Sequence, residues 1–273
     1  MKVAGSINRE WSPVNRSRET EYPMGHELNS SERHSPEVVE YRKGGDGFVN
    51  VDRYDSTRYE SRAARYRQTV MANAYKRLMG PLAGKRVLDV GCGTGRGFAD
   101  FAKEAKFVVG ADASIDMLKV AAGKVNSSPR LGLANAVAQA LPFADASFDI
   151  VISLNFLHLF SLETQREMVQ EMKRVVRPGG TVIIELDNAL HGVVVGPCKR
   201  WFGDEKGSLP REIRYMVGDQ CQIVRYYGAV VPVLWRIFHR FPALFLRLEK
   251  LEYYPPFNRL AHRIYCKILP NGL

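Results

Sequence analysis

The sequence predicts an α/β fold in which a doubly wound, mostly parallel sheet carries helices on both faces. Short apolar runs typical of buried strands alternate with amphipathic helical stretches from about residue 85 to residue 187. Such alternation is typical of parallel strands joined by crossover helices. The chain has 273 residues, of which 45% are hydrophobic and 25% charged. It is therefore long enough and apolar enough to bury a sizeable core.

The N-terminal part is expected to lie outside this sheet. Residues 1–46 are polar and show neither helical nor strand periodicity, so we expect a disordered tail. Residues 47–83 are expected to form an N-terminal helical lid, and Gly80 with Pro81 ends its helix. The apolar side chains of this helix recur at spacings of three and four, as in an amphipathic helix: Tyr59, Ala63, Tyr66, Val70, Ala74 and Leu78.

Strands and helices then alternate through an expected core, residues 84–192. The predicted strands are KRVLDVG, FVVGAD, LGLAN, FDIVISL and TVIIELD, and the predicted helices begin near Arg96, Ile115 and Leu162. We expect residues 178–180, Pro-Gly-Gly, to form a turn before the last of these strands. Residues 193–273 end in the strand-like HRIYCKIL and are expected to complete the sheet.

Cysteine usage and hydropathy exclude several classes of protein. The chain has four cysteines, which lie far apart and form no CxxC pair: Cys92, Cys198, Cys221 and Cys266. This spacing predicts neither a zinc site nor a disulfide framework, and no cluster with ligand spacing predicts another metal. The N-terminus lacks the apolar core of a signal peptide, and no run is long enough to span a membrane. We expect a cytoplasmic protein.

The net charge of +10 is concentrated at the C-terminal end. Residues 199–273 carry 13 basic against 6 acidic side chains, whereas residues 1–83 carry 14 against 11 and residues 84–198 carry 12 against 12. Such an excess fits a nucleic acid, an anionic membrane surface, an acidic substrate or a solvated face. Residues 231–257 interleave large apolar side chains with basic ones, so we expect a lid or an interfacial patch with peripheral membrane contact.

The stretch VLDVGCGTGRG breaks from an apolar strand into alternating glycines. Gly91, Gly93 and Gly95 have no Cβ, so a ligand can approach their backbone closely. A dinucleotide-binding turn would have its third glycine where Arg96 stands. Asp89, two positions before the first glycine, would repel a pyrophosphate and attract a ligand with an ammonium and a sulfonium group. The turn is therefore expected to hold a cationic amino-acid moiety.

A second acid follows the next predicted strand. Asp112 lies 21 positions after Gly91, close to the spacing of about 20 at which an acid binds ribose hydroxyls. An acid at a strand end can also be a helix cap, and Ser114 can take that role here. We favour the ribose role for Asp112.

With these motifs in place, the sequence resembles the class I S-adenosylmethionine-dependent methyltransferases, in the branch of quinone-biosynthesis and related small-molecule enzymes. VLDVGCGTGRG resembles the first motif of the family and GADASIDML the second; ALPFADASFDIVIS resembles the third with the fourth strand, and VVRPGGTVIIE the turn with the fifth strand. The match runs from about residue 84 to residue 187. It implies a Rossmann-like fold, an enzyme, and S-adenosyl-L-methionine as co-substrate.

The resemblance also implies a set of donor-binding residues: Asp89, Gly91, Cys92, Gly93, Gly95, Asp112, Ala113, Ala138, Gln139 and Asn155. Asp89 and Gly91 are expected at the methionine part, Asp112 at the ribose, and Ala138 with Gln139 at the adenine. The family often has an aspartate where this chain has Val137, so the adenine contact through that side chain is in question.

Methyl transfer from a sulfonium mainly requires that donor and acceptor be aligned and water excluded. A base is needed only where the acceptor atom carries a proton. His158, Asp187 and His191 are the candidates, with Glu185 beside them, because the ends of the fourth and fifth strands open onto the cleft of such a sheet. Each candidate also has a purely structural interpretation as a packed or capping side chain.

We expect methyl transfer to a small-molecule or lipid-linked biosynthetic acceptor, recognised by residues 47–83 and 193–273. Arg211, Arg214 and Tyr215 either face that acceptor or form solvated helix surface. Methylation of nucleic acid is the alternative, but no RNA-binding module accompanies the basic C-terminus, and SLNF stands where such enzymes carry an NPPY-like tetrapeptide. A donor-binding regulatory protein without catalysis is a further alternative.

Overall fold

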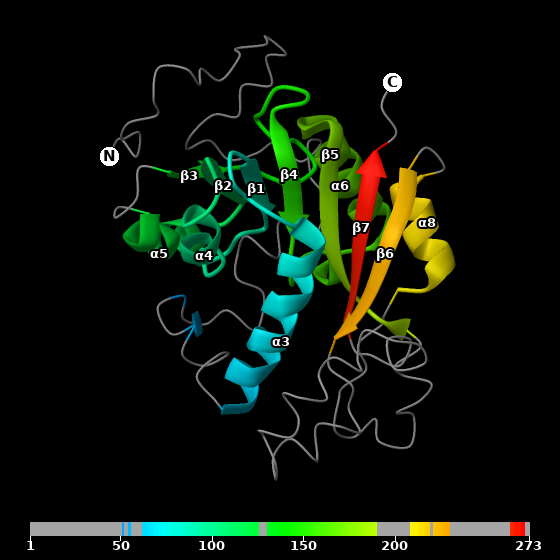
Figure 1. Ribbon diagram of the computed structural model, residues 1–273, viewed down its shortest axis with the longest axis horizontal. Helices are drawn as coiled ribbons and strands as arrows, with labels where there is room; N and C mark the ends of the chain where they lie inside the picture. The colour runs from blue at the N-terminus through cyan, green and yellow to red at the C-terminus, as the bar shows by residue number, and fades with distance from the viewer. Residues whose placement is uncertain are drawn as a thin grey trace, which may run out of the picture.

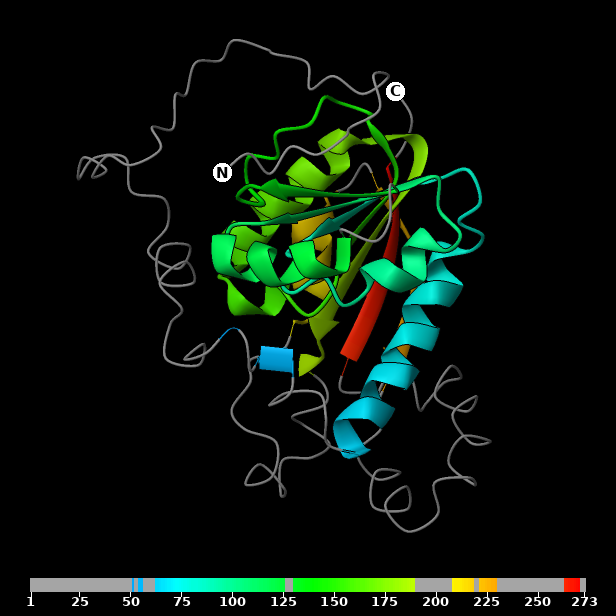
Figure 2. The same cartoon turned by 90° about the vertical axis from the view of Figure 1, so that its left-hand side faces the viewer.

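The computed structural model describes residues 51, 54–55, 62–125, 130–189, 208–218, 221–229 and 263–270. These residues form a seven-stranded sheet of order β3-β2-β1-β4-β5-β7-β6 with helices on both faces (Figures 1 and 2). The strands are β1 (Arg86–Val90), β2 (Phe107–Asp112), β3 (Leu131–Asn135), β4 (Phe148–Ser153), β5 (Val176–Asp187), β6 (Cys221–Ala229) and β7 (Arg263–Pro270).

The first five strands are parallel, and the last two extend the sheet beyond β5. β1 pairs in parallel with β2 and β4, and β3 and β5 pair in parallel with β2 and β4 respectively. β7 lies antiparallel between β5 and β6. The predicted doubly wound, mostly parallel sheet is confirmed, and the expected C-terminal strand is found as β7, from Arg263 to Pro270. The sequence analysis did not predict β6.

Helices cover the sheet on two sides (Figure 2). One side carries α3 (Arg62–Met79), α4 (Phe98–Ala102) and α5 (Ile115–Val125), and the other carries α6 (Leu162–Val175) and α8 (Pro210–Val217). The helices predicted from Ile115 and Leu162 are confirmed at these starting residues. Ser161 begins α6 because its side chain accepts a hydrogen bond from the backbone N–H of Thr164. The helix predicted near Arg96 begins two residues later.

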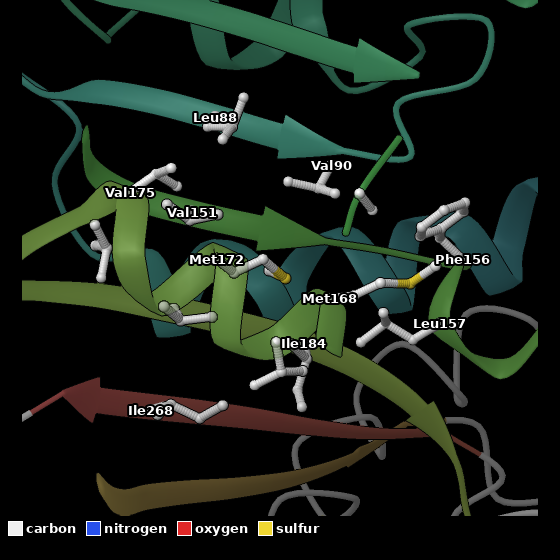
Figure 3. Packing of buried hydrophobic residues seen from close by; sticks show 14 of the residues in the cluster. Leu88, Val90, Val151, Phe156, Leu157, Met168, Met172, Val175, Ile184 and Ile268 are labelled. Carbon is white, nitrogen blue, oxygen red and sulfur yellow. The ribbon is translucent and has the colours of Figure 1, made fainter. Parts of the chain in front are cut away.

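Alternate strand residues divide between two apolar layers, because side chains of a strand point to opposite faces in turn. Val87, Ile152 and Ile183 pack with Leu78 and other residues of α3, α4 and α5. The second layer lies under α6 and α8 and includes Leu88, Val151, Ile184, Met168 and Met172 (Figure 3). The connection between β3 and β4 contains no helix and supplies Leu141 and Phe143 to this second layer.

The Pro-Gly-Gly segment differs from its predicted position. Residues 178–180 lie within β5, which starts at Val176, and not in a turn before the strand. Gly179 has a φ of 71°, and the pairing with β4 shifts register between Phe148 and Ile150. The strand therefore bends at Gly179, where glycine tolerates the left-handed conformation, and then resumes its pairing.

Candidate donor-binding site

The glycine turn connects the end of β1 to α4 and is anchored on β2. The backbone N–H groups of Gly91 and Cys92 donate to the carbonyl oxygen of Ala111, at 2.8 and 3.1 Å. Gly91, Gly93 and Gly95 have φ angles of 72°, 51° and 71°. These angles lie in the left-handed region, which favours glycine, so the alternating glycines are required by the path of the backbone.

Gly91 and Gly93 have different surroundings. A Cβ built at Gly91 would lie 2.2 Å from Cγ of Phe156, so the aromatic ring occupies the place of a side chain. A Cβ at Gly93 would meet no atom within 4 Å. Phe156 precedes η2 (Leu157–Leu159), the short helix after β4, and packs the start of this segment against the turn. The backbone at Gly93 is thus open to a ligand, whereas the backbone at Gly91 is covered by the ring.

Asp112 ends β2 and ties that strand to the glycine turn. Its carboxylate oxygens accept from the backbone N–H groups of Gly93 and Ser114, each at 2.8 Å. The side chain is 2% exposed, and burial raises the pKa of Asp112 while these two hydrogen bonds oppose the rise. Ser114 accepts through its hydroxyl from the N–H of Met117 at 3.3 Å, so Ser114 caps α5 and the cap does not require Asp112.

Asn135, at the end of β3, supports this corner and was missed by the sequence analysis. Its Nδ2 donates to the carbonyl oxygens of Asp112 and Ala113, at 3.0 and 3.1 Å. These bonds hold the backbone after β2 in place. An asparagine at the end of a strand next to the acid-bearing strand is the signal that could have identified it.

Asp89 lies within β1, between Gly110 of β2 and Ile152 of β4, on the face that α3 covers. Its side chain is 6% exposed. Burial, and second the charge of Asp112, raise the pKa of Asp89 to about 8. A cation placed beside Asp89 would favour its ionised form, because opposite charges stabilise each other strongly away from water.

Further acidic and phenolic groups share this face. Glu185 of β5 lies opposite Tyr265 of β7, and both side chains are fully buried. Tyr75 of α3 lies in the field of Asp89 and Glu185: burial, then Asp100, then these two carboxyl groups raise the pKa of Tyr75 far above its usual range. α3 therefore closes one side of an acidic region. The sequence analysis did not identify Tyr75 or Tyr265, because their positions depend on long-range packing.

The connection from β3 to β4 holds the residues expected at the adenine. Ala138 is 6% exposed and packs in the same apolar layer as Val90 and Ala111, which lie at the ends of β1 and β2. Gln139 is half-buried, and Val137 packs partly buried against that layer. Apolar contact is thus what this part of the chain offers to a base.

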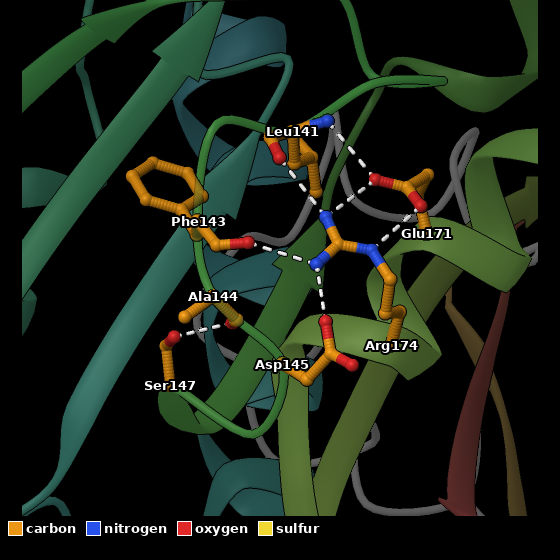
Figure 4. Close-up of polar contacts among 7 residues, drawn as sticks. All are labelled: Leu141, Phe143, Ala144, Asp145, Ser147, Glu171 and Arg174. Atoms are coloured by element: carbon orange, nitrogen blue, oxygen red, sulfur yellow. Dashed lines mark hydrogen bonds and ion pairs between the residues drawn. The ribbon is translucent and has the colours of Figure 1, made fainter. Parts of the chain in front are cut away.

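This connection is fixed by an ion pair on α6 (Figure 4). The guanidinium of Arg174 donates to the carbonyl oxygens of Leu141 and Phe143, at 2.9 and 2.8 Å, and to Asp145 at 2.8 Å. Glu171 accepts from Arg174 and from the backbone N–H of Leu141, the latter at 3.0 Å. Neither Glu171 nor Arg174 was predicted from the sequence, since each looks like an ordinary charged helix residue.

The remaining expected site residues are distributed around the turn. Cys92 is half-buried, and burial raises the pKa of its thiol, so the group stays protonated at neutral pH. Asn155 is half-buried with a φ of 56°. His158 is half-buried in η2, two residues after Phe156. Asp187 is buried at the end of β5, and its carbonyl oxygen accepts from the N–H of Ser208. His191 lies outside the described residues.

The basic and aromatic residues of α8 face solvent and not the turn. Arg211 and Arg214 are exposed. Tyr215 is 43% exposed, and the guanidinium of Arg166 on α6 lies 4.5 Å from its ring centroid. The interpretation as solvated helix surface therefore describes these three residues. Residues 231–257 lie outside the described part of the chain.

The described ranges contain neither a metal-binding cluster nor a membrane-spanning helix. In them, no group of three or more His, Cys, Asp or Glu side chains is arranged to hold a metal ion. No helix in the described residues combines the length and the apolar character needed to cross a membrane.

The chain is similar to known proteins over its central region. Residues 87–180 match a family model described as a methyltransferase domain. Over 111 residues the chain is 38% identical to a demethylmenaquinone methyltransferase of Clavibacter sepedonicus, covering 41% of this chain and 44% of the relative. Over 127 residues it is 36% identical to the methyltransferase GfsG of Streptomyces halstedii, covering 42% and 45%. The chain thus spans less than half the length of these curated relatives.

Solved structures share the fold over a larger part of the chain. The magnesium protoporphyrin IX methyltransferase of Synechocystis PCC 6803, crystallised with bound S-adenosylmethionine, has a TM-score of 0.58 at 16% identity, covering 89% of this chain and all of that chain. The PH0226 protein of Pyrococcus horikoshii OT3 has a TM-score of 0.60 at 17% identity, covering 82% and 100%. At these identities the likeness concerns the fold alone.

Proposed function

We propose that the chain transfers a methyl group from S-adenosylmethionine to a small-molecule acceptor, because residues 87–180 belong to the S-adenosylmethionine-dependent methyltransferases. The observation that carries the proposal is the pair of buried acids, Asp89 and Asp112, on either side of a glycine turn with open backbone at Gly93. When bound, the donor supplies an electrophilic methyl group on a sulfonium.

The residues at the turn fit the chemistry of this donor. Asp89 offers a buried negative charge to the ammonium and sulfonium end, and ionises more readily beside a cation. Each oxygen of Asp112 already accepts one backbone N–H and keeps a further lone pair for a ribose hydroxyl. Ala138 and Val137 offer apolar contact to the adenine. These proposed assignments provide a partner for the amino-acid end, the ribose and the adenine of the donor.

The protein contributes chiefly by alignment. The turn, fixed on Ala111 and Asp112, holds the donor at the C-terminal ends of β1 and β2, while the acceptor lies toward the ends of β4 and β5. The acceptor atom forms the new bond to the methyl carbon as the sulfur–methyl bond breaks, and the electron pair of that bond stays on sulfur. α3 excludes water on the side of Asp89 and Glu185.

A proton on the acceptor atom would pass to a base near the ends of β4 and β5. We propose His158 or Asp187 for this role, and His191 remains a candidate outside the described residues. His158 follows the segment that packs on Gly91, and Asp187 ends β5 on the same face as Glu185. Single replacements His158→Gln and Asp187→Asn should lower kcat with little change in donor affinity if they act as the base.

The acceptor is proposed to be a biosynthetic small molecule, with a lipid-linked quinone-type ring as the first candidate. The demethylmenaquinone methyltransferase of Clavibacter sepedonicus supports this choice, because it is 38% identical to the chain over 111 residues. We assign acceptor recognition to residues 47–83 and 193–273. We also propose that residues 231–257 bring the protein to a membrane surface, in keeping with a cytoplasmic, peripheral location.

Donor binding is tested by calorimetry with S-adenosylmethionine and S-adenosylhomocysteine. Asp112→Ala should weaken binding by about 1.5–3 kcal/mol, the loss expected for hydrogen bonds to a charged group. Asp116→Ala, which removes an exposed carboxylate on α5, is the matched control and should leave affinity unchanged. Failure of the unmodified protein to bind either molecule would refute the proposed function.

Catalysis is tested by incubating the protein with methyl-labelled S-adenosylmethionine and fractionated cell extract. Label should move into a small or lipid-soluble molecule, and transfer into nucleic acid alone would refute the proposed acceptor class. Donor binding without transfer to any fraction would instead favour a regulatory role. For the membrane contact, vesicle co-sedimentation should depend on anionic lipid and on salt, and a charge-reversal variant at Arg236, Arg240 and Arg247 should lose it.

A further inference from the structure

Arg96 stands at the position where a dinucleotide-binding turn has a glycine, and its side chain contacts the N-terminal part of the chain. Its Nη2 donates a short hydrogen bond to Oε1 of Gln68 on α3. Its Nε lies 3.8 Å from Oδ1 of Asp55. Arg96 thus connects the glycine turn with Gln68 and Asp55, which lie 28 and 41 positions earlier in the chain.

The same carboxylate oxygen of Asp55 also binds the turn directly. Oγ1 of Thr94 donates to Oδ1 of Asp55 at 2.8 Å. Thr94 lies between Gly93 and Gly95 and is 2% exposed, whereas the side chains of Arg96 and Asp55 are 34% and 35% exposed. Asp55 therefore joins a buried hydroxyl of the turn to a half-exposed guanidinium.

α3 also contacts α4, the helix that follows the turn. Nζ of Lys76 lies 3.0 Å from Oδ2 of Asp100, and the rings of Tyr75 and Phe101 meet edge to face at a centroid distance of 5.8 Å. The segment from the glycine turn to α4 is thus held along its length by Asp55 and α3. The Lys76–Asp100 pair is about half exposed, so it is expected to contribute little energy.

We propose that Arg96, together with Thr94 and Asp55, is a positioning residue that couples the docking of α3 to donor binding. The inference rests on the proposed function, since the turn must bind the donor for the coupling to matter. Three glycines in left-handed conformations give the unliganded turn many alternatives, and ordering them opposes binding. Tying Thr94 and Arg96 to Asp55 and Gln68 restricts those alternatives before the donor arrives.

Coupling of this kind is reciprocal. If docked α3 favours the turn conformation that binds the donor, then the bound donor favours docked α3 by the same factor. Both directions can be measured with S-adenosylhomocysteine, which binds without reacting. Affinity reports one direction, and hydrogen exchange of the α3 amides with and without the ligand reports the other.

The experiment compares the full chain with Arg96→Ala, Asp55→Ala and the double variant. Each single variant should weaken S-adenosylhomocysteine binding roughly fivefold to twentyfold, within the range typical of coupled sites. The loss of affinity in the double variant should be smaller than the two single losses combined, because both single variants remove the Arg96–Asp55 contact. Arg96→Ala also removes the bond to Gln68, and Asp55→Ala also removes the bond to Thr94. Lys103→Ala, which removes an exposed cation that pairs with Asp100 on α4, is the control and should bind like the unmodified protein.

Hydrogen exchange supplies a readout that loss of stability alone would not produce. In the unmodified protein the ligand should slow exchange in α3, and in Arg96→Ala this added protection should disappear. Should Arg96→Ala fail to fold, Thr94→Val tests the same link, since it removes the hydroxyl that donates to Asp55 and keeps the side-chain volume.

Three results would overturn the inference. Equal affinity and equal ligand-induced protection of α3 in the variants would show that the contact does not position the turn. Weaker binding in Arg96→Ala with unchanged binding in Asp55→Ala would show that Asp55 takes no part in positioning the turn. If the losses of S-adenosylhomocysteine affinity in the two single variants simply add in the double variant, Arg96 and Asp55 act independently. Absence of binding to the unmodified protein would refute the proposed function itself and is distinguishable from these results.

Discussion

Asp89 and Asp112 are buried acids on the adjacent parallel strands β1 and β2, and the charge of Asp112 adds to burial in raising the pKa of Asp89 to about 8. Asp112 satisfies its charge with the backbone N–H groups of Gly93 and Ser114. The two acids thus have different tasks at neutral pH. Asp112 accepts hydrogen bonds from the backbone, and Asp89 is proposed to bind the cationic end of the donor.

Binding of S-adenosylhomocysteine should strengthen as the pH rises from about 6 to about 8. Below the raised pKa of Asp89 the carboxyl group is protonated in the free protein, and binding of the ammonium group expels that proton, so affinity should rise by at most about tenfold per pH unit. Calorimetry in buffers of different ionisation enthalpy measures the proton release directly. Asp89→Asn should show weak, pH-independent binding; a pH dependence that survives this change would assign the proton to another group.

The stability of the unliganded protein should fall as the pH rises from about 4 to about 8. The pKa of Asp89 is raised in the folded state, so the folded protein keeps a proton that the unfolded chain has lost, and the slope reaches about 1.4 kcal/mol per pH unit. Urea unfolding across this range measures it. Asp89→Asn should lack this contribution, whereas Asp116→Asn, at an exposed site, should retain it. A saturating concentration of S-adenosylhomocysteine should reduce this loss of stability with rising pH.

Gly91→Ala should lower the stability of the folded protein far more than Gly93→Ala. Both positions have positive φ, but only at Gly91 would the new methyl group overlap the ring of Phe156. We expect a loss of about 2–4 kcal/mol for Gly91→Ala and about 1 kcal/mol for Gly93→Ala. Thermal unfolding measures the difference, and Phe156→Leu in the Gly91→Ala background should recover part of it. Equal losses at the two glycines would mean that the ring yields easily.

Arg174→Met should loosen the connection between β3 and β4 and weaken donor binding at its adenine end. The change leaves the carbonyl oxygens of Leu141 and Phe143 without their charged donor, at a loss of about 2 kcal/mol in unfolding free energy. Arg177→Met is the matched control, because Arg177 pairs with Asp149 near the start of β4. Arg177→Met should lower stability without changing the affinity for S-adenosylhomocysteine. Equal effects of the two variants on this affinity would contradict a local role for Arg174.

Local patterns in the sequence were sufficient to predict the central fold and the position of the glycine turn. The strand–helix alternation and the glycine run predicted β1 to β5 and the turn, because hydrophobic periodicity and glycine spacing express short-range backbone requirements. Asp89 and Asp112 could be proposed as donor-binding residues from the sequence, because Asp89 lies two positions before the first glycine and Asp112 ends the next predicted strand. The exact start of β5 could not be predicted from the sequence, because β5 bends at Gly179 and continues on both sides of it.

Only the tertiary structure decided which distant groups meet around the turn. The sequence alone placed Gln68 and Asp55 in an N-terminal segment, and the fold brings both to Arg96. Pairing of β7 between β5 and β6 likewise places Tyr265 opposite Glu185. These contacts depend on chain topology and on side-chain packing between elements far apart in sequence, and no local pattern records the choice of partner. The sequence therefore determined the chemistry of the turn, and the folded chain determined what covers it and holds it.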